Sequence, residues 1–252
     1  MRDWRTIRRW VVAACMVIAP VAVAVIRALI PYSSSPSGAL AASLAHANLY
    51  PALAAAEVIV VFTMGFAMLG LGRLIQVRAP LLALIGTPIA VLSWILGGGV
   101  LGTLDSVTYE MAQLTSAGPI TATILERINA NSEIGIFFGV FISGHLLGTL
   151  LLGIGLLVSH RVPAWAGIAV IAGDVLHPVA FVLLQSHALD ALSYLILAAG
   201  MVMAARAVLA TPKRPMVCRA RASKSLSQGS SRSDRELHLW WPGTRSASIP
   251  FT

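Results

Sequence analysis

The chain has 252 residues, of which 57% are hydrophobic and only 11% charged, and its mean hydropathy is +0.82. This composition excludes a soluble globular domain and predicts an integral membrane protein. The formal net charge of +8 is concentrated at the ends of the sequence, where residues 1–10 carry +3 and residues 211–252 carry +6. Basic residues beside apolar segments are typical of the cytoplasmic side of a membrane, so we expect contact with anionic lipid rather than with nucleic acid.

The first apolar segment, residues 10–30, follows four arginines and is expected to cross the membrane. Its length of about twenty residues suffices for a span and exceeds that of a signal-peptide core, so we expect it to remain uncleaved, with its N-terminus in the cytoplasm. Arg27 lies one turn before its outer end, where the long side chain can reach the membrane surface or a carboxylate. Residues 31–50 are uncharged and are expected to form an outer loop with a short interfacial helix.

The second predicted span covers residues 51–71 and carries an acid, Glu57, in its outer third. At about 1.5 Å per residue, Glu57 and Arg27 lie at a similar depth below the outer membrane boundary. The two side chains can therefore form an ion pair. The short turn that follows contains Arg73 and Arg78, which is typical of a cytoplasmic loop.

The third span is predicted at residues 81–103, and the longest connection between spans follows it at 105–131. By alternation this connection lies outside, and Asp105 stands at its beginning. Two stretches within it, 106–114 and 121–128, are not apolar enough to cross a membrane. We expect each of them to form a short helix over the mouth of the bundle.

The fourth span, residues 134–159, is rich in glycine and contains His145 near its middle. Small residues let membrane helices approach closely. We therefore expect close packing of this span through its glycines on or near one face, namely Gly135, Gly139, Gly144 and Gly148. The turn after it, with His160 and Arg161, is again typical of the cytoplasmic side.

The fifth span, residues 162–185, carries an acid and an imidazole in the middle of an apolar segment. A helix advances by about 100° per residue, which puts Asp174 and His177 on one face. Pro178 has no N–H and therefore leaves the carbonyl of Asp174, four residues earlier, without its helical partner. Ionisable groups at this depth are costly and usually face a protein interior or a watery cavity. This turn is the first candidate for a functional site.

A sixth span is predicted at residues 190–210, after a very short outer turn. Six spans with both termini in the cytoplasm place the basic loops inside. The predicted fold is therefore all-α, a polytopic bundle of six transmembrane helices over residues 1–210. Residues 211–252 are basic, rich in serine and non-periodic, and we expect them to form a disordered cytoplasmic tail.

A single cavity that opens outward is expected to gather the ionisable residues of several spans. Depths along the helices put one group near the membrane midplane and a second group closer to the outer surface. Aromatic rings of the neighbouring spans can contact an apolar or cationic substrate. The candidate catalytic residues are Asp174, His177, His145 and Glu57, and the candidate substrate-binding residues are Arg27, Asp105, Trp94, Phe141 and Phe181.

Each of these groups also has a structural interpretation. The arginine and the glutamate of the first two spans can simply neutralise each other, and a buried acid and histidine can hold two helices together by a hydrogen bond. Two histidines and a carboxylate are suitable ligands for zinc or iron, but an HExxH motif and a third histidine are missing from this set. Haem ligation is disfavoured because one of the two histidines shares its turn with an acid. No metal or cofactor is therefore predicted.

Ten residues of the fourth and fifth spans and the turn between them form a recognisable pattern: His145, Gly148, Leu151, Gly153, Arg161, Val162, Pro163, Trp165, Ala166 and Gly167. This pattern resembles that of small six-span bacterial membrane proteins, mostly of unknown function, and the residue usage is similar to that of actinobacterial proteins. The resemblance implies a multi-pass protein of the bacterial plasma membrane. In size and buried acids the chain also resembles membrane-bound terpene cyclases, which protonate a prenyl chain to start a carbocation cascade. That resemblance implies that Glu57 and Asp174 donate the proton.

Three functional hypotheses follow. The first is an enzyme that performs acid–base chemistry on a lipid or isoprenoid within the bilayer, because a carboxylic acid in apolar surroundings favours its neutral form and can donate a proton to the substrate. The second is a small proton-coupled transporter in which the same acids and histidines relay protons. The third is a structural membrane protein without chemistry. The sequence leaves the substrate and the oligomeric state open.

Overall fold

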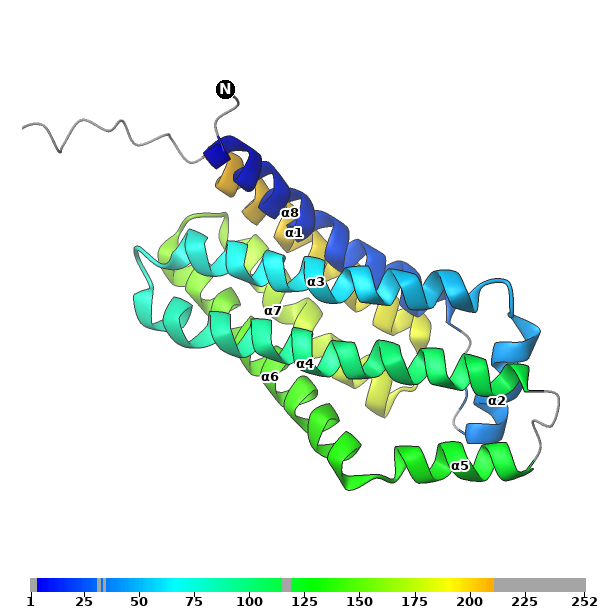
Figure 1. The fold of residues 1–252 in the computed structure, drawn as a ribbon. Coiled ribbons are helices and arrows are strands. Elements are labelled where there is room, and N and C mark those ends of the chain that lie inside the picture. Colours follow the sequence, from blue (N-terminus) through cyan, green and yellow to red (C-terminus); the bar gives the residue numbers. More distant parts are fainter. Residues whose placement is uncertain (1–3, 31–32, 34, 115–118, 211–252) are drawn as a thin grey trace, which may run out of the picture. The chain divides into compact units, whose positions relative to one another are not determined.

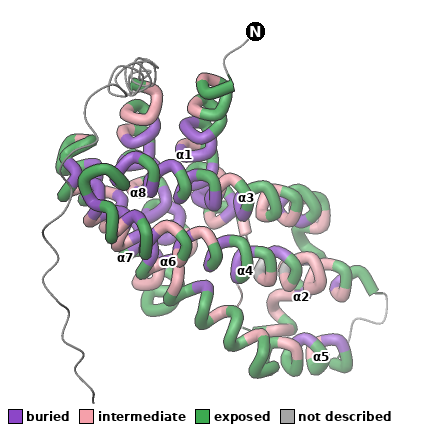
Figure 2. Tube along the Cα trace, turned by 60° about the vertical axis from the view of Figure 1, so that its left-hand side comes forward, coloured by how far each residue is buried: buried purple, intermediate pink, exposed green. Residues whose placement is uncertain are grey.

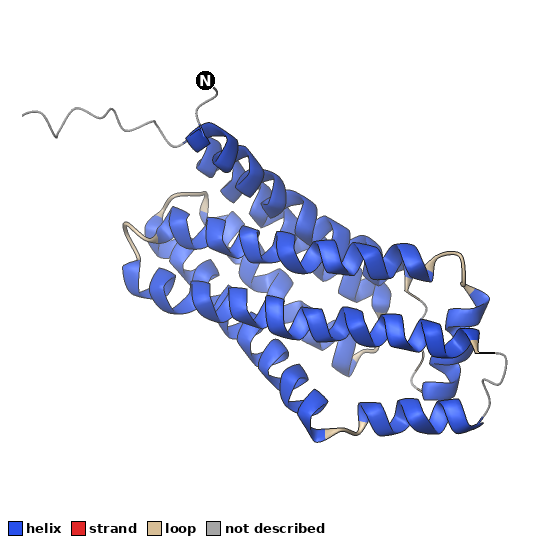
Figure 3. Cartoon of the chain, viewed as in Figure 1, coloured by secondary structure: helices blue, strands red, loops and turns tan. Residues whose placement is uncertain are grey.

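The computed structural model describes residues 4–30, 33, 35–114 and 119–210, apart from the side chains of Leu101 and Asp105. The described residues form helices and no strands, which confirms the all-α prediction (Figure 3). The chain divides into a unit at Met1–Thr211 and a second unit at Pro212–Thr252. The second unit, which contains the predicted basic tail, lies outside the described residues.

Six helical segments of the described chain are long and apolar enough to cross a membrane, which is consistent with an integral membrane protein that crosses it several times. Figure 1 shows them as long helices lying side by side. Their bounds are α1 (Trp4–Leu29), α3 (Tyr50–Ile75), α4 (Pro80–Gln113), α6 (Ser132–Ser159), α7 (Ala164–Pro178) with its π-helical continuation η1 (Val179–Leu183), and α8 (His187–Ala210). Two shorter helices are α2 (Pro36–Ala45) and α5 (Pro119–Asn129).

The long helices close into a ring. Each contacts the long helix before and after it in the sequence, and α1 contacts α8. Neighbours run antiparallel, so α1, α4 and α7 begin at the end where α3, α6 and α8 finish. We call this the basic end, because several arginines of the chain lie in it, and we call the opposite end, where α2 and α5 lie, the loop end.

The interior of the ring is built from flexible and branched apolar side chains, whereas large apolar side chains also cover its exterior. Figure 2 shows buried residues gathered where the long helices meet, and mostly exposed residues on α5. An apolar exterior is the surface that lipid tails would solvate. The largest fully buried apolar side chains are Met16, Met64, Met68, Leu71, Ile75, Leu152, Leu156 and Met201.

The connection after the third span differs from the prediction. The stretch 106–114 is the last part of α4 rather than a separate helix, and α4 has 34 residues in all. At 1.5 Å per residue this helix is about 50 Å long, which exceeds the roughly 30 Å hydrocarbon core of a membrane. α5 contains the second predicted stretch and packs with α2 and the end of α4 through Leu40, Ala112 and Leu125.

The four glycines of α6 that were expected to pack closely fall into two pairs. A Cβ atom added at Gly148 would lie 2.5 Å from the backbone nitrogen of Ala90, and one added at Gly144 would lie 2.8 Å from Ser93 Cβ, so both residues let α6 approach α4 closely. A Cβ atom at Gly135 or Gly139 would meet nothing within 4 Å. The expectation of close packing is therefore correct for only half of this glycine series.

Arginines complete two helix ends at the basic end. Arg78 donates a hydrogen bond of 3.1 Å from Nη1 to the carbonyl of Ser159, and Arg9 donates bonds of 2.7 to 3.1 Å to the carbonyls of Val208 and Leu209. The last carbonyls of a helix have no intrahelical donors. These arginines therefore satisfy the ends of α6 and α8 and tie them to segments that are distant in the sequence.

Candidate functional site

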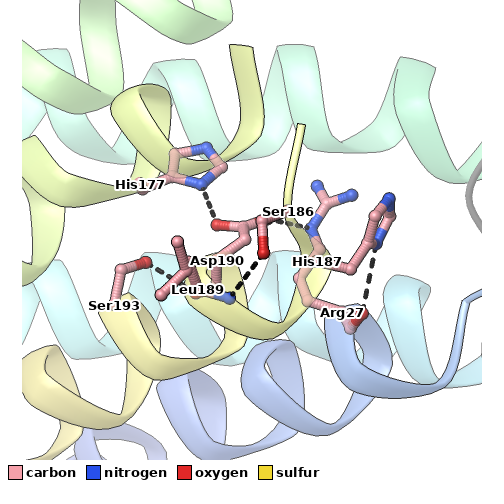
Figure 4. Close-up of polar contacts among 7 residues, drawn as sticks. All are labelled: Arg27, His177, Ser186, His187, Leu189, Asp190 and Ser193. Carbon is pink, nitrogen blue, oxygen red and sulfur yellow. Dashed lines mark hydrogen bonds and ion pairs between the residues drawn. The ribbon is translucent and has the colours of Figure 1, made fainter. Parts of the chain in front are cut away.

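A buried carboxylate, Asp190, lies at the centre of the most connected polar group in the described chain. It belongs to the first turn of α8 and is fully buried. Its Oδ1 lies 2.5 Å from Nδ1 of His177 on α7, and its Oδ2 lies 3.5 Å from Nε of Arg27 at the end of α1. Figure 4 shows the histidine and the arginine approaching Asp190 from two different helices. We call Asp190, His177 and Arg27 the Asp190 cluster.

The tight turn between η1 and α8 brings His177 and Asp190 together. Residues 184–186 are all that separates the two helical segments, and Gln185 adopts the left-handed conformation with φ of 48°. Because the segments then run antiparallel, residues at similar distances from the turn lie at the same level. Asp190 was predicted only as the first residue of the sixth span, so sequence reasoning missed its role.

Aromatic rings enclose the imidazole of His177. Its ring centroid lies 5.0 Å from that of Tyr194, 5.5 Å from that of His145 and 6.1 Å from that of Phe181. The guanidinium carbon of Arg27 lies 5.2 Å from the centroid of the Phe181 ring, a cation–π contact. Of the five predicted substrate-binding residues, Arg27 is thus a member of the cluster and Phe181 contacts it.

The second predicted histidine, His145, continues the row of rings into the interior. Its Nδ1 donates a hydrogen bond of 2.7 Å to the carbonyl of Phe141, one helical turn earlier, which leaves Nε2 as the acceptor nitrogen. This Nε2 is buried and has no hydrogen-bond partner among the described residues. Trp94 packs its edge on Phe141 at 5.2 Å and lies 5.7 Å from the His145 ring. Three of the predicted site residues, His145, Phe141 and Trp94, thus contact one another.

Asp174 has a different environment, although it shares a helix face with His177. It is buried and interacts with the hydroxyl of Thr149 on α6, and its Oδ2 has no hydrogen-bond partner among the described residues. The carboxylate bonded to His177 belongs instead to α8. The expected acid–imidazole contact thus exists with a different acid.

A small cavity lies beside the cluster. Its volume is about 40 Å³, which is room for only a few water molecules. Arg27 and Glu57 both line it, so the predicted gathering of these two residues occurs, while the ion pair of Arg27 is with Asp190. The remaining lining residues are Val23, Ile26, Val60, Val61, Trp94, Gly98, Gly102, Phe141 and Tyr194. The predicted mouth residue Asp105 has a side chain that lies outside the described residues.

Two wall residues connect this cavity to the Asp190 cluster. Arg27 faces the cavity and contacts Asp190, and Tyr194 faces the cavity while its ring packs on His177. Tyr194 was not a candidate in the sequence, although it follows Asp190 by one helical turn. The cluster therefore lies directly behind the wall of a small, partly polar cavity.

In the part of the chain that the structure describes, no three His, Cys, Asp or Glu side chains lie close enough together to bind one metal ion. Known proteins give no further guide, because no protein-family model, curated protein or solved structure matches the chain.

Proposed function

We propose that the chain is a membrane enzyme that performs acid–base chemistry on a lipid substrate, with His177 as the group that accepts and returns the proton. The observation that carries this proposal is the 2.5 Å contact between His177 Nδ1 and Asp190 Oδ1. A buried carboxylate on one imidazole nitrogen holds the ring in one orientation and leaves the other nitrogen as the base. The same arrangement activates histidines in unrelated hydrolytic enzymes.

The proposal assigns each member of the cluster a role. Asp190 is a positioning residue that accepts the Nδ1–H of His177 and stabilises the imidazolium formed when Nε2 takes a proton. Arg27 offsets the charge of Asp190 and, from the cavity wall, can bind an anionic or carbonyl group of the substrate. Glu57 faces the same cavity and suits a cationic or hydroxyl group. Tyr194 lines the cavity and packs its ring on His177, so it is assigned to the wall between the substrate and the base.

The size of the cavity limits which part of a substrate can enter. A volume of about 40 Å³ accommodates a small polar group but not a prenyl chain. The tails of the substrate would therefore remain in the surrounding lipid while the reacting headgroup enters the ring. For this reason we propose acid–base chemistry on the headgroup of a lipid and not cyclisation of an enclosed isoprenoid.

A second candidate function is proton-coupled transport. It is favoured by the row of groups that runs from His145 through His177 and Asp190 to Arg27, and then to His187, whose Nδ1 lies 3.2 Å from the Arg27 carbonyl. Imidazoles and carboxylates in series can pass protons through a membrane interior. In this alternative the same cluster would move a proton along the bundle rather than to a substrate.

The proposal can be tested with the full chain in lipid nanodiscs. Wild-type protein would be incubated with a total polar lipid extract and the lipids compared by mass spectrometry with those from His177→Gln. The matched control is His46→Gln, since His46 is an exposed histidine directly after α2 and outside the cluster. We expect conversion of a lipid species by the wild type and the control but not by His177→Gln.

Conversion that is equal in all three proteins, or no conversion in any of them, contradicts the enzyme. The transporter alternative has its own measurement, a proton flux in liposomes that carry a pH-sensitive dye. A flux that depends on His177 without any change in the lipids would favour transport.

A further inference from the structure

A groove at the basic end of the ring gathers three arginines that belong to two different helices. It is lined by Arg8, Arg9 and Val12 of α1, by Gly70, Arg73 and Leu74 of α3, and by Val208 of α8. Its volume is about 200 Å³, several times that of the cavity beside Asp190. The groove is therefore large enough for a phosphate group and part of its attached glycerol.

The charge of this groove is not balanced within the described residues. Arg9 is held in place by its bonds to the last carbonyls of α8, so it forms a fixed wall. Arg8 and Arg73 are exposed and make no ion pair or hydrogen bond in the described part of the chain. No acidic side chain lines the groove. The fixed and the exposed guanidinium groups together favour an anion.

A second groove lies beside Arg73. It lies between α3 and α4, has a volume of about 450 Å³, and is lined mainly by apolar and small residues: Leu69, Gly72, Gln76, Pro80, Ala83, Leu84, Thr87 and Pro88. Arg73 lines both grooves. A positively charged recess and a largely apolar trough therefore share one arginine at the end of membrane-spanning helices.

We infer that these two grooves bind one anionic phospholipid, with its phosphate at Arg8 and Arg73 and an acyl chain against Leu69, Ala83 and Leu84. Guanidinium groups pair with phosphate oxygens in a forked geometry, and basic residues at a membrane surface attract anionic headgroups. The apolar trough lies where acyl chains are, since it runs along two spanning helices. This inference uses residues remote from the Asp190 cluster and does not depend on the proposed enzyme.

The inference is tested by lipid binding to the purified full chain, measured by native mass spectrometry and by the shift in thermal unfolding. The probes are phosphatidylglycerol, phosphatidylcholine and inorganic phosphate. The test variant is Arg8→Gln/Arg73→Gln. The matched control is Arg161→Gln/Arg206→Gln, which removes the same charge from exposed arginines of the same end that line neither groove.

We expect the wild type and the control to retain phosphatidylglycerol in preference to phosphatidylcholine, and Arg8→Gln/Arg73→Gln to bind it about 10- to 30-fold more weakly. Arg8→Lys/Arg73→Lys keeps the charge but not the forked pairing, so it should recover only part of the affinity, which would show that the charge at these positions rather than a change of fold is responsible. Equal loss in the test and control variants, equal retention of the two lipids, or equal protection by inorganic phosphate would each overturn the assignment to a phospholipid.

Discussion

Two buried acids, Asp190 and Asp174, have opposite surroundings although they lie near each other in the bundle. His177, which pairs with Asp190, lies about one helical turn from Asp174 on α7. Asp190 has an arginine and a histidine as partners, whereas Asp174 interacts with a threonine hydroxyl. An ionised carboxylate within apolar surroundings needs a counter-charge, but a neutral carboxyl needs only hydrogen bonds. The two acids therefore differ in their partners: Asp190 contacts charged or ionisable side chains of α1 and α7, whereas the contact of Asp174 links α7 to α6.

The largest effect is expected from removing the carboxylate of Asp190. Asp190→Ala leaves Arg27 without its counter-ion and His177 without its hydrogen-bond acceptor, so we expect the free energy of unfolding to fall by about 3–5 kcal/mol. Reversible unfolding in mixed detergent micelles measures this change. The double variant Arg27→Met/Asp190→Ala should lose less than the single one, because the unpaired charge is gone. A loss from Asp190→Ala below about 1 kcal/mol would contradict the importance of the cluster.

A second contrast, within α6, tests whether the ring is as tightly packed as the close glycine contacts indicate. Gly148→Ala puts a Cβ atom 2.5 Å from the backbone of Ala90 and should lower the free energy of unfolding by about 1–3 kcal/mol. The control Gly139→Ala adds the same atom where nothing lies within 4 Å, and it should be neutral or slightly stabilising. Equal effects of the two substitutions would mean that α4 and α6 are not in close contact at Gly148.

The sequence predicts the six spans well but the partners inside them only in part. Span positions follow from length and hydropathy, because a membrane requires about twenty apolar residues for each crossing. The depth of a residue along the bundle axis can also be predicted from the sequence, since short turns make neighbouring helices antiparallel. Thr149 and Asp174 lie equally far from the centre of the turn between α6 and α7. Around the next turn the match is poorer, because His177 lies eight residues before Gln185 and Asp190 five residues after it.

Helix rotation and ring closure are not predictable in the same way. Hydropathy does not tell which of several residues at one level point inward, so Asp190 was treated as the edge of a span. The expected partner of Arg27 was Glu57 on the next span. Because α1 also contacts α8, Arg27 reaches Asp190, and that long-range contact has no signal in a single sequence.

Removing the aromatic ring of Phe181, which contacts the cluster, should have a smaller effect on stability. Phe181→Leu removes the ring beneath the Arg27 guanidinium and should cost about 0.5–1 kcal/mol of stability. Phe137→Leu is a matched control, because Phe137 is exposed to a similar extent, 43% against 37%, and lies on another helix. Unfolding measurements of both variants in the Arg27→Met background isolate the contact, since the cost of Phe181→Leu should shrink there. A cost unchanged by the absence of Arg27 would show that the ring acts through packing alone.

The smallest expected effect sharpens the comparison between the two acids. Asp174→Asn keeps the size of the side chain and its ability to bond with Thr149, and it orphans no charged partner among the described residues. We therefore expect a change below about 1 kcal/mol in the free energy of unfolding. The change is measured in the same detergent system.

The same variant also separates the proposed chemistry from its alternatives, because the lipid conversion proposed above should survive Asp174→Asn and be lost in Asp190→Asn. Loss of conversion in a stably folded Asp174→Asn protein would reverse this assignment and make Asp174 the proton donor, as the resemblance to terpene cyclases implies. If both variants fold and neither changes lipids or proton flux, the Asp190 cluster serves to hold α1, α7 and α8 together. The two acids belong to different helices, α7 and α8, so the pair of substitutions tests position as well as chemistry.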